Sequence, residues 1–472
     1  MDCVDGYIAQ VWTGTAREPN FYNGVQKERV FENAFLEYGC MKSMTAPLNR
    51  KMYFLTDPIE DRAKDWLGYK INYQATFAAQ LMYPMVDTYE VMPWPDRIYQ
   101  GLYRIAGTDQ QERIPRSYST QMQTMVNTLN DIRTSDKKIT GTQGIGVLMA
   151  NSLMFQRFPN HNGYDDPQFS SFYGQTLPLL KRGIPVELVH MENTPFKETF
   201  KGLHILVMSY SNMKPMKLEY HNYLADWVKK GGILIYCGED IDPYQTVLEW
   251  WNTDGNEYKA PSEHLFEKMN LSRNPGEGTY RYGKGTVIVM REDPKHFVLK
   301  AGNDQKYFET IASAYQKKIG KEIETKNSFI VERGPYTIAA VMDESVSKEP
   351  LTLSGLYIDL FDKDLPVLTS KQIQPGEQGY LYDLNKVSGK IKAKVLCGAS
   401  RIYDEKVSKQ SYSFVAKSPI NTTNVSRVLL PRKPEKIRVN GKEEQPEWDE
   451  SSKTLLLSFE NDPAGVNVSI EW

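Results

Sequence analysis

The amino-acid sequence predicts an α/β protein whose C-terminal part is all-β. Up to about residue 320, short apolar runs alternate with amphipathic segments of helical spacing, the pattern of parallel α/β folds. Beyond about residue 325, apolar and polar residues alternate with period two between turn signals such as Pro375-Gly376 and Asn440-Gly441. A chain of 472 residues is too long for one ordinary core, so we expect several domains.

The first region, residues 1–138, predicts three strand–helix units. We expect strands at 6–13, 52–56 and 88–92, and helices at 26–44, 66–81 and 118–132. In the first helix, Val30, Phe31, Ala34, Phe35 and Tyr38 share one face. Because a closed (β/α)8 barrel needs eight strands, this region is predicted to be the C-terminal part of such a barrel.

The second region, residues 139–322, predicts a doubly wound parallel domain of flavodoxin type. Short buried-type strands are expected at 145–150, 185–190, 204–209, 233–236 and 286–290, with helices at 172–181, 219–229 and 305–318. Lys284 lies between two glycines, but a strand rather than a helix follows it, so we predict a hairpin turn and not a phosphate loop. The third region, residues 323–472, predicts one or two β-sandwiches.

Acidic and aromatic residues follow two of the predicted strands in the first region. Asp57 comes directly after the run 52–56, and Glu60 and Asp61 follow after two further residues. Glu90 and Trp94 lie at the end of the next strand. Catalytic residues of parallel barrels gather at the C-terminal ends of the strands. Glycoside cleavage needs paired carboxylates, and an aromatic ring offers a flat apolar face to a sugar.

Each of these residues also has a plainer interpretation. Asp57 precedes a proline and is typical of a turn aspartate, while Glu60 and Asp61 are typical of solvated loop acids. Glu90 is equally consistent with a structural ion pair to Arg97, and Trp94 with packing at a barrel rim. Trp12 and Arg17, after the first strand, are weaker candidates of the same kind.

Composition excludes several other classes of function. The net charge of −2 lacks the basic excess of a nucleic-acid surface. The four cysteines and six histidines show no metal-ligand spacing, so neither a metal site nor a cofactor is expected. No run of 18 apolar residues predicts a membrane helix. The first residues lack the features of a signal peptide, so the location stays open: cytoplasmic for a genuine start, secreted or periplasmic if residues precede it.

Cys237 follows the predicted strand 233–236 in the run Tyr236-Cys237-Gly238-Glu239 and is placed like the nucleophile of amidotransferases. A thiol nucleophile needs a histidine and an acid close by, and neither His264 nor His296 has that context. A buried structural cysteine is therefore the favoured interpretation.

The order of these regions, with the runs Tyr53-Phe-Leu-Thr-Asp57-Pro and Tyr89-Glu90-Val-Met-Pro-Trp94, resembles the β-galactosidases of glycoside hydrolase family 42. The resemblance implies barrel strands six to eight, an amidotransferase-like trimerisation domain and an appended β-sandwich. It places Asp57 at the nucleophile position, one methylene shorter than the family's glutamate, and Trp94 at the sugar subsite. The family's acid/base strand would lie before Met1, so we expect a chain truncated at its N-terminus.

Three functions remain open on the sequence. The first is a retaining, β-galactosidase-like hydrolase with Asp57 and Glu90 as catalytic carboxylates and a carbohydrate as its substrate. The second is a non-catalytic carbohydrate-binding or assembly module. The third is an amidotransferase-like enzyme that depends on Cys237. The resemblance also implies a homo-oligomer, a trimer or dimer, and neither nucleic acid nor membrane is expected as a partner.

Overall fold

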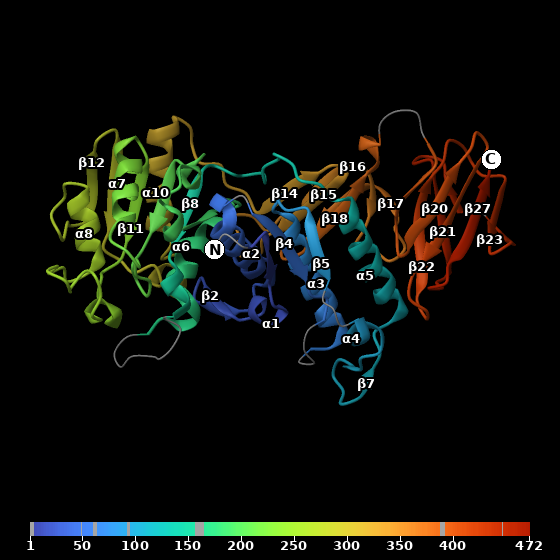
Figure 1. Ribbon diagram of the computed structural model, residues 1–472, viewed down its shortest axis with the longest axis horizontal. Helices are drawn as coiled ribbons and strands as arrows, with labels where there is room; N and C mark the ends of the chain where they lie inside the picture. The colour runs from blue at the N-terminus through green and yellow to red at the C-terminus, as the bar shows by residue number, and fades with distance from the viewer. Residues whose placement is uncertain are drawn as a thin grey trace.

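The computed structural model describes residues 4–48, 50–59, 64–91, 95–155, 165–387, 392–445 and 447–472. The molecule is elongated, and its parts do not follow one another in chain order. The second region lies at one end, the first region in the middle and the last two sheets at the other end (Figure 1). Parallel α/β sheets are thus followed by antiparallel all-β sheets, as the sequence predicts.

The first region contains a parallel sheet of three strands in the order β1-β4-β5, formed by β1 (Gly6–Gln10), β4 (Lys51–Thr56) and β5 (Thr88–Val91). Helices α2 (Val30–Thr45) and α3 (Trp66–Leu81) connect the strands. Phe54 is fully buried against Tyr38, with ring centroids 4.5 Å apart, which fixes the face of β4 that the helices cover.

Two boundaries in this region differ from the prediction. The first strand ends at Gln10, because helix α1 (Thr13–Ala16) follows it. The predicted helix 26–44 begins only at Val30, because β2 (Asn20–Tyr22) and β3 (Val25–Lys27) form a hairpin. Asn23 and Gly24 both have positive φ in its turn, as Asn-Gly does in tight hairpins.

The second region forms a six-stranded sheet in the order β12-β13-β11-β10-β8-β9. Its five parallel strands are β8 (Ile145–Met149), β9 (Glu187–His190), β10 (Ile205–Met208), β11 (Ile233–Cys237) and β13 (Gly285–Met290), and β12 (Gly278–Tyr282) is antiparallel. Every residue of β8, β10 and β11 is buried, as expected of parallel strands covered on both faces. Lys284 lies in the β12–β13 hairpin turn, which confirms that prediction.

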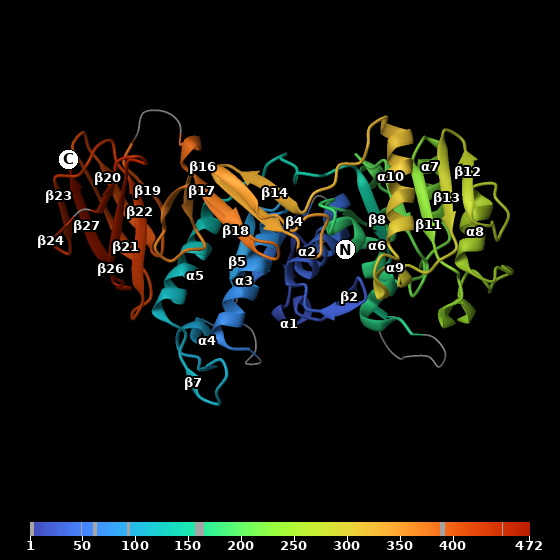
Figure 2. The same ribbon diagram turned by 180° about the vertical axis from the view of Figure 1, so that it is seen from behind.

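The third region begins with a sheet in the order β14-β15-β18-β16-β17 that packs on the first region (Figure 2). Tyr380 of β18 contacts Phe77 of α3, with ring centroids 5.4 Å apart, and donates a hydrogen bond to Thr128 in α5 (Arg116–Thr128). The strands are β14 (Ser328–Arg333), β15 (Tyr336–Val341), β16 (Leu351–Asp359), β17 (Val367–Ile373) and β18 (Gln378–Asp383).

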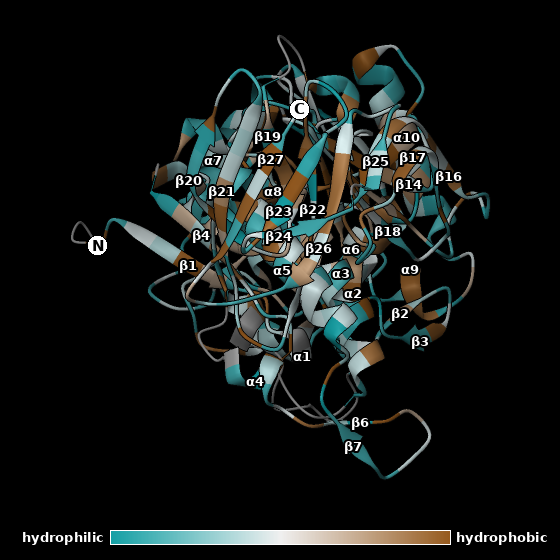
Figure 3. Ribbon diagram, turned by 90° about the vertical axis from the view of Figure 1, so that its right-hand side faces the viewer, coloured by the Kyte–Doolittle hydropathy of each residue, from teal (hydrophilic) through white to brown (hydrophobic). Residues whose placement is uncertain are grey.

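The last two sheets have a core of their own. Tyr412, Phe414, Val428 and Leu455 belong to it, and hydrophobic residues alternate with hydrophilic ones along these strands (Figure 3). Their orders are β19-β22-β26-β25 and β20-β21-β27-β23-β24. The strands are β19 (Lys394–Gly398), β20 (Arg401–Val407), β21 (Ser411–Lys417), β22 (Thr423–Leu429), β23 (Lys436–Val439), β24 (Lys442–Glu444), β25 (Glu447–Asp449), β26 (Thr454–Glu460) and β27 (Val466–Glu471).

The remaining elements are shorter or cover the sheets. They are α4 (Pro95–Tyr99), α6 (Ser170–Leu180), α7 (Tyr220–Lys229), α8 (Pro261–Lys268), α9 (His296–Leu299), α10 (Gln305–Ile319), β6 (Tyr103–Arg104) and β7 (Gln111–Glu112), with single-turn 3-10 helices between them. In the described parts of the chain, no helix has both the length and the apolar character needed to cross a bilayer.

Buried charges tie the three regions together. Lys181, at the end of α6, is fully buried and forms ion pairs with Glu32 of α2 and with Asp343, which follows β15, the latter at 2.7 Å. The buried Arg29 contacts Glu344 at 2.9 Å. Because a buried cation without its partners is strongly destabilising, these contacts fix how the regions meet.

Candidate functional site

The candidate site lies at the C-terminal ends of β1, β4 and β5. The register aligns Gln10 with Leu55 and Leu55 with Glu90, so these three side chains form one row across a single face of the sheet. Asp57 follows two residues after Leu55. The ends of two neighbouring strands therefore each present a carboxylate.

This face of the sheet is the one that α2 and α3 leave uncovered. The preceding row consists of Ile8, Tyr53 and Thr88, and Ile8 is 58% exposed, whereas Phe54 on the opposite face is fully buried. β1 lies at the periphery of the molecule (Figure 3). Among the described strands, β1 and β5 each pair with β4 alone.

Asp57 is buried, with only 4% of its surface exposed. Its surroundings contain two buried phenols: Tyr38 donates to the carbonyl of Leu55 at 3.2 Å, and Tyr73 accepts from Thr56 Oγ1 at 3.0 Å. Burial raises the pKa of both phenols, and the negative charge of Asp57 raises each further. Both hydroxyls therefore stay protonated beside Asp57 at neutral pH.

The other predicted site residues are distributed around this edge. Glu90 is half-buried on β5, Trp12 is 53% exposed just after β1, and Arg17 is half-buried after α1. Trp94, Glu60 and Asp61 lie outside the described residues. The convergence of Asp57, Glu90 and Trp94 on one pocket stays a prediction.

Glu37 is a further acid near this edge that the sequence analysis did not identify. It lies half-buried on α2, and its Oε2 accepts a hydrogen bond from Thr15 in α1 at 2.8 Å. Burial raises the pKa of Glu37 to about 7, although the bond from Thr15 lowers it. A carboxyl group that titrates near neutrality can act as a proton donor or acceptor. Nothing in the local sequence signals this pKa, because it arises from the packing of α1 against α2.

Cys237 lies in a setting that opposes thiol chemistry. It is fully buried at the end of β11, and burial raises its pKa, with Glu292 and Asp293 adding to the effect. His221 and His264 contact each other through their Nδ1 atoms at 2.8 Å, and no hydrogen bond recorded in the described structure joins either to Cys237. Because a thiolate is the reactive form, this arrangement favours a structural cysteine.

In the described part of the chain, no three His, Cys, Asp or Glu side chains are grouped as metal ligands would be. The polar groups at and near the strand ends are the carboxylates of Asp57 and Glu90, the phenols of Tyr38 and Tyr73 and the amide of Gln10. Groups of these kinds can form hydrogen bonds with sugar hydroxyls, and carboxyl groups and phenols can also transfer protons.

Comparison with known proteins gives distant structural matches. No family model matches the chain, and neither does any curated protein. A β-galactosidase from Bacillus circulans sp. alkalophilus aligns with a TM-score of 0.40 and 11% identity over 75% of this chain and 58% of its own. A catalytic mutant of a GH42 β-galactosidase from G. stearothermophilus aligns at 0.38 and 9% identity, over 75% and 57%. A rhamnosidase from Novosphingobium sp. PP1Y aligns at 0.38 and 10%, over 99% and 46%.

The chain is thus distantly similar in structure to GH42 β-galactosidases and to other glycoside hydrolases. It spans less than two thirds of the length of each of these three structures.

Proposed function

We propose that this chain is the C-terminal part of a retaining glycoside hydrolase that acts on β-galactosides or related sugars. One observation carries the proposal: Asp57 comes directly after β4, and Glu90 lies near the end of β5, the neighbouring parallel strand. Parallel strands lie roughly 5 Å apart and two residues extend roughly 7 Å, so the two Cα atoms lie on the order of 8 Å apart. Two carboxyl groups at that spacing reach the same sugar ring.

Retaining hydrolysis uses two carboxyl groups about 5 Å apart, one as nucleophile and one as acid and then base. We assign the nucleophile to Asp57, whose charge adds to the raised pKa of the buried phenols Tyr38 and Tyr73. Glu90 stabilises the positive charge that develops on the sugar ring. The acid/base comes from strands that this sheet lacks, because three strands do not close a barrel.

The remaining regions follow from the same proposal. Residues 1–138 supply three βα units of a (β/α)8 barrel, residues 139–322 form a flavodoxin- or amidotransferase-like domain, and residues 323–472 form β-sandwich domains. The middle domain assembles a trimer or dimer rather than catalysing, because its buried Cys237 lacks the environment of a nucleophile.

The experiment measures nitrophenol release from a panel of nitrophenyl glycosides. It compares this chain with the longest protein that the same open reading frame encodes. We expect hydrolysis of a β-galactoside that falls by orders of magnitude in Asp57→Asn and Glu90→Gln, because both act mainly on the transition state. The matched controls Asp109→Asn and Glu112→Gln, both exposed near the β6–β7 hairpin, should keep full activity. Near-normal turnover in both site variants would remove the basis for this site.

A non-catalytic binding or assembly module is the second candidate, and the edges of β1 and β5 that pair with no other described strand favour it. Open parallel edges invite pairing with another polypeptide. Sugar binding that depends on Asp57, without hydrolysis by either form of the chain, would support this module over the hydrolase.

A further inference from the structure

A cavity of about 380 Å³ lies where the first region meets the second, and its lining does not include the strand ends of the candidate site. The ends of α2 and α3 form one wall, and the starts of β8 and β9 form the other. Cavities that bind small molecules commonly have this size and lie between domains. The cavity is therefore large enough for a small organic ligand.

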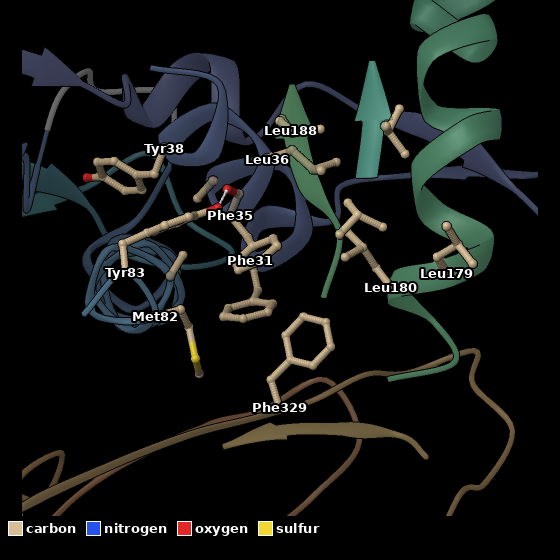
Figure 4. Packing of buried hydrophobic residues seen from close by; sticks show 14 of the residues in the cluster. Phe31, Phe35, Leu36, Tyr38, Met82, Tyr83, Leu179, Leu180, Leu188 and Phe329 are labelled. Atoms are coloured by element: carbon tan, nitrogen blue, oxygen red, sulfur yellow. Dashed lines mark hydrogen bonds between the residues drawn. The ribbon is translucent and has the colours of Figure 1, made fainter. Parts of the chain in front are cut away.

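The inner wall of the cavity is apolar. Phe35, Met82, Tyr83 and Leu188 line it, from α2, the end of α3 and β9 (Figure 4). The polar group of Tyr83 already has a partner within the protein, because its hydroxyl donates to the carbonyl of Phe35. Burial of apolar ligand surface against this wall is favourable. The part of the ligand that contacts it needs no polar group.

The mouth of the cavity carries an excess of positive charge. Lys137, Lys138 and Lys201 are exposed and line it, and in the part of the chain that the structure describes none of them forms an ion pair. Two acids also line the cavity: Glu187 pairs with Lys42, while Glu198 forms no ion pair with any residue that the structure describes. Flexible lysine stems can place their ammonium groups over the opening.

One exposed apolar side chain lines the cavity, and two more are chain neighbours of lining residues. Met85 lines the cavity itself, while Met44 and Leu48 are neighbours in the chain of the lining residues Ser43 and Pro47. Methionine adapts its shape to apolar ligands of varied outline. A ligand with an extended apolar body therefore finds contact both inside and at the mouth.

We propose that this cavity binds a small anionic amphiphile, a molecule with an apolar chain or ring and one carboxylate. The apolar body lies against Phe35, Met82 and Tyr83, and the carboxylate lies among Lys137, Lys138 and Lys201. The proposal does not depend on sugar hydrolysis, because the cavity shares no residue with the strand ends that carry Asp57 and Glu90.

The test measures binding of decanoate and of decanol to the full chain by isothermal titration calorimetry. The first variant is the triple substitution Lys137→Ala, Lys138→Ala and Lys201→Ala. The matched control removes three exposed lysines from the C-terminal sheets, Lys406→Ala, Lys409→Ala and Lys433→Ala. A third variant, Met85→Trp, narrows the mouth without changing its charge.

We expect decanoate to bind the unmodified chain and the control equally, and the first variant about tenfold more weakly. Decanol should bind both triple variants with the same affinity, and Met85→Trp should weaken both ligands. Absence of decanoate binding to the unmodified chain would overturn the proposal. An equal loss of decanoate affinity in the two triple variants would also overturn it. Circular dichroism of every variant excludes unfolding as the cause.

Discussion

Arg333 links the third region to the first, and its removal should destabilise both. The side chain is 2% exposed and reaches from the β14–β15 hairpin into the segment that joins α3 to β5. It donates to the carbonyls of Val86 at 2.5 Å and Leu81 at 3.4 Å, to the Tyr89 hydroxyl at 2.6 Å and, after α5, to the carbonyl of Arg133 at 3.1 Å. Arg333→Ala removes all four hydrogen bonds at once.

The size of the effect follows from these contacts. A hydrogen bond from a charged donor contributes about 1.5–3 kcal/mol, and the two short bonds to Val86 and Tyr89 should dominate. Arg333→Ala should therefore lower the free energy of unfolding by about 3–5 kcal/mol. Arg333→Lys should recover part of this loss, because an ammonium group keeps the charge but not the planar fork.

The assay is urea unfolding of the full chain together with amide hydrogen exchange. We expect faster exchange at residues 81–91 in Arg333→Ala, because the carbonyls there lose their donor. The control is Arg438→Ala, which breaks a partly exposed ion pair with Glu471 at 2.9 Å and should cost below about 0.5 kcal/mol. A loss below about 1 kcal/mol in Arg333→Ala, with unchanged exchange at 81–91, would refute the reasoning.

Three further predictions concern titratable groups. Burial alone would raise the pKa of Asp343, but Lys181 and Lys27 lower it from 3.8 to about 2. The ionised carboxylate therefore stabilises the folded protein fully above about pH 4, and this contribution is lost as the pH falls toward 2. Acid unfolding of Asp343→Asn should lack this dependence. Burial raises the pKa of Glu37 from 4.5 to about 7, so stability should fall as the pH rises through this interval, and melting temperatures of Glu37→Gln should not follow that decline. Cys237 should react with iodoacetamide only after denaturation, and Cys237→Ser should leave any sugar hydrolysis unchanged; labelling of the native thiol would contradict its burial.

The elements that could be predicted from the sequence are those with strong local signals. Helix α3 spans Trp66–Leu81 as predicted, and its Asp65 N-cap accepts a hydrogen bond from the Gly68 amide at 2.7 Å. The start of α2 was wrong because the Asn23-Gly24 turn closes a hairpin inside the predicted helix. Helix α8 was missed, because the amphipathic pattern of its eight residues is too short to outweigh the surrounding polar sequence.

The candidate site was predictable only in part. The placement of Asp57 and Glu90 near strand ends was predictable, because short apolar runs next to acids indicate where strands end, while their role in a sugar site stays a prediction. Glu37, by contrast, acquires its pKa of about 7 from packing between α1 and α2, which no local pattern encodes. Arg333 has no local sequence signal for its role, because its four hydrogen-bond partners come from segments at least 200 residues earlier in the chain.

The central claim is that the ends of β4 and β5 form one sugar site with Asp57 as its nucleophile. Retaining hydrolysis passes through a covalent glycosyl-enzyme, which an activated 2-deoxy-2-fluoro-galactoside traps on the nucleophile. The most direct measurement is peptide mass spectrometry of the hydrolytically active form after such trapping. The account predicts a label on Asp57 that Asp57→Asn abolishes, and a label on a residue outside the β4 and β5 strand ends would contradict it.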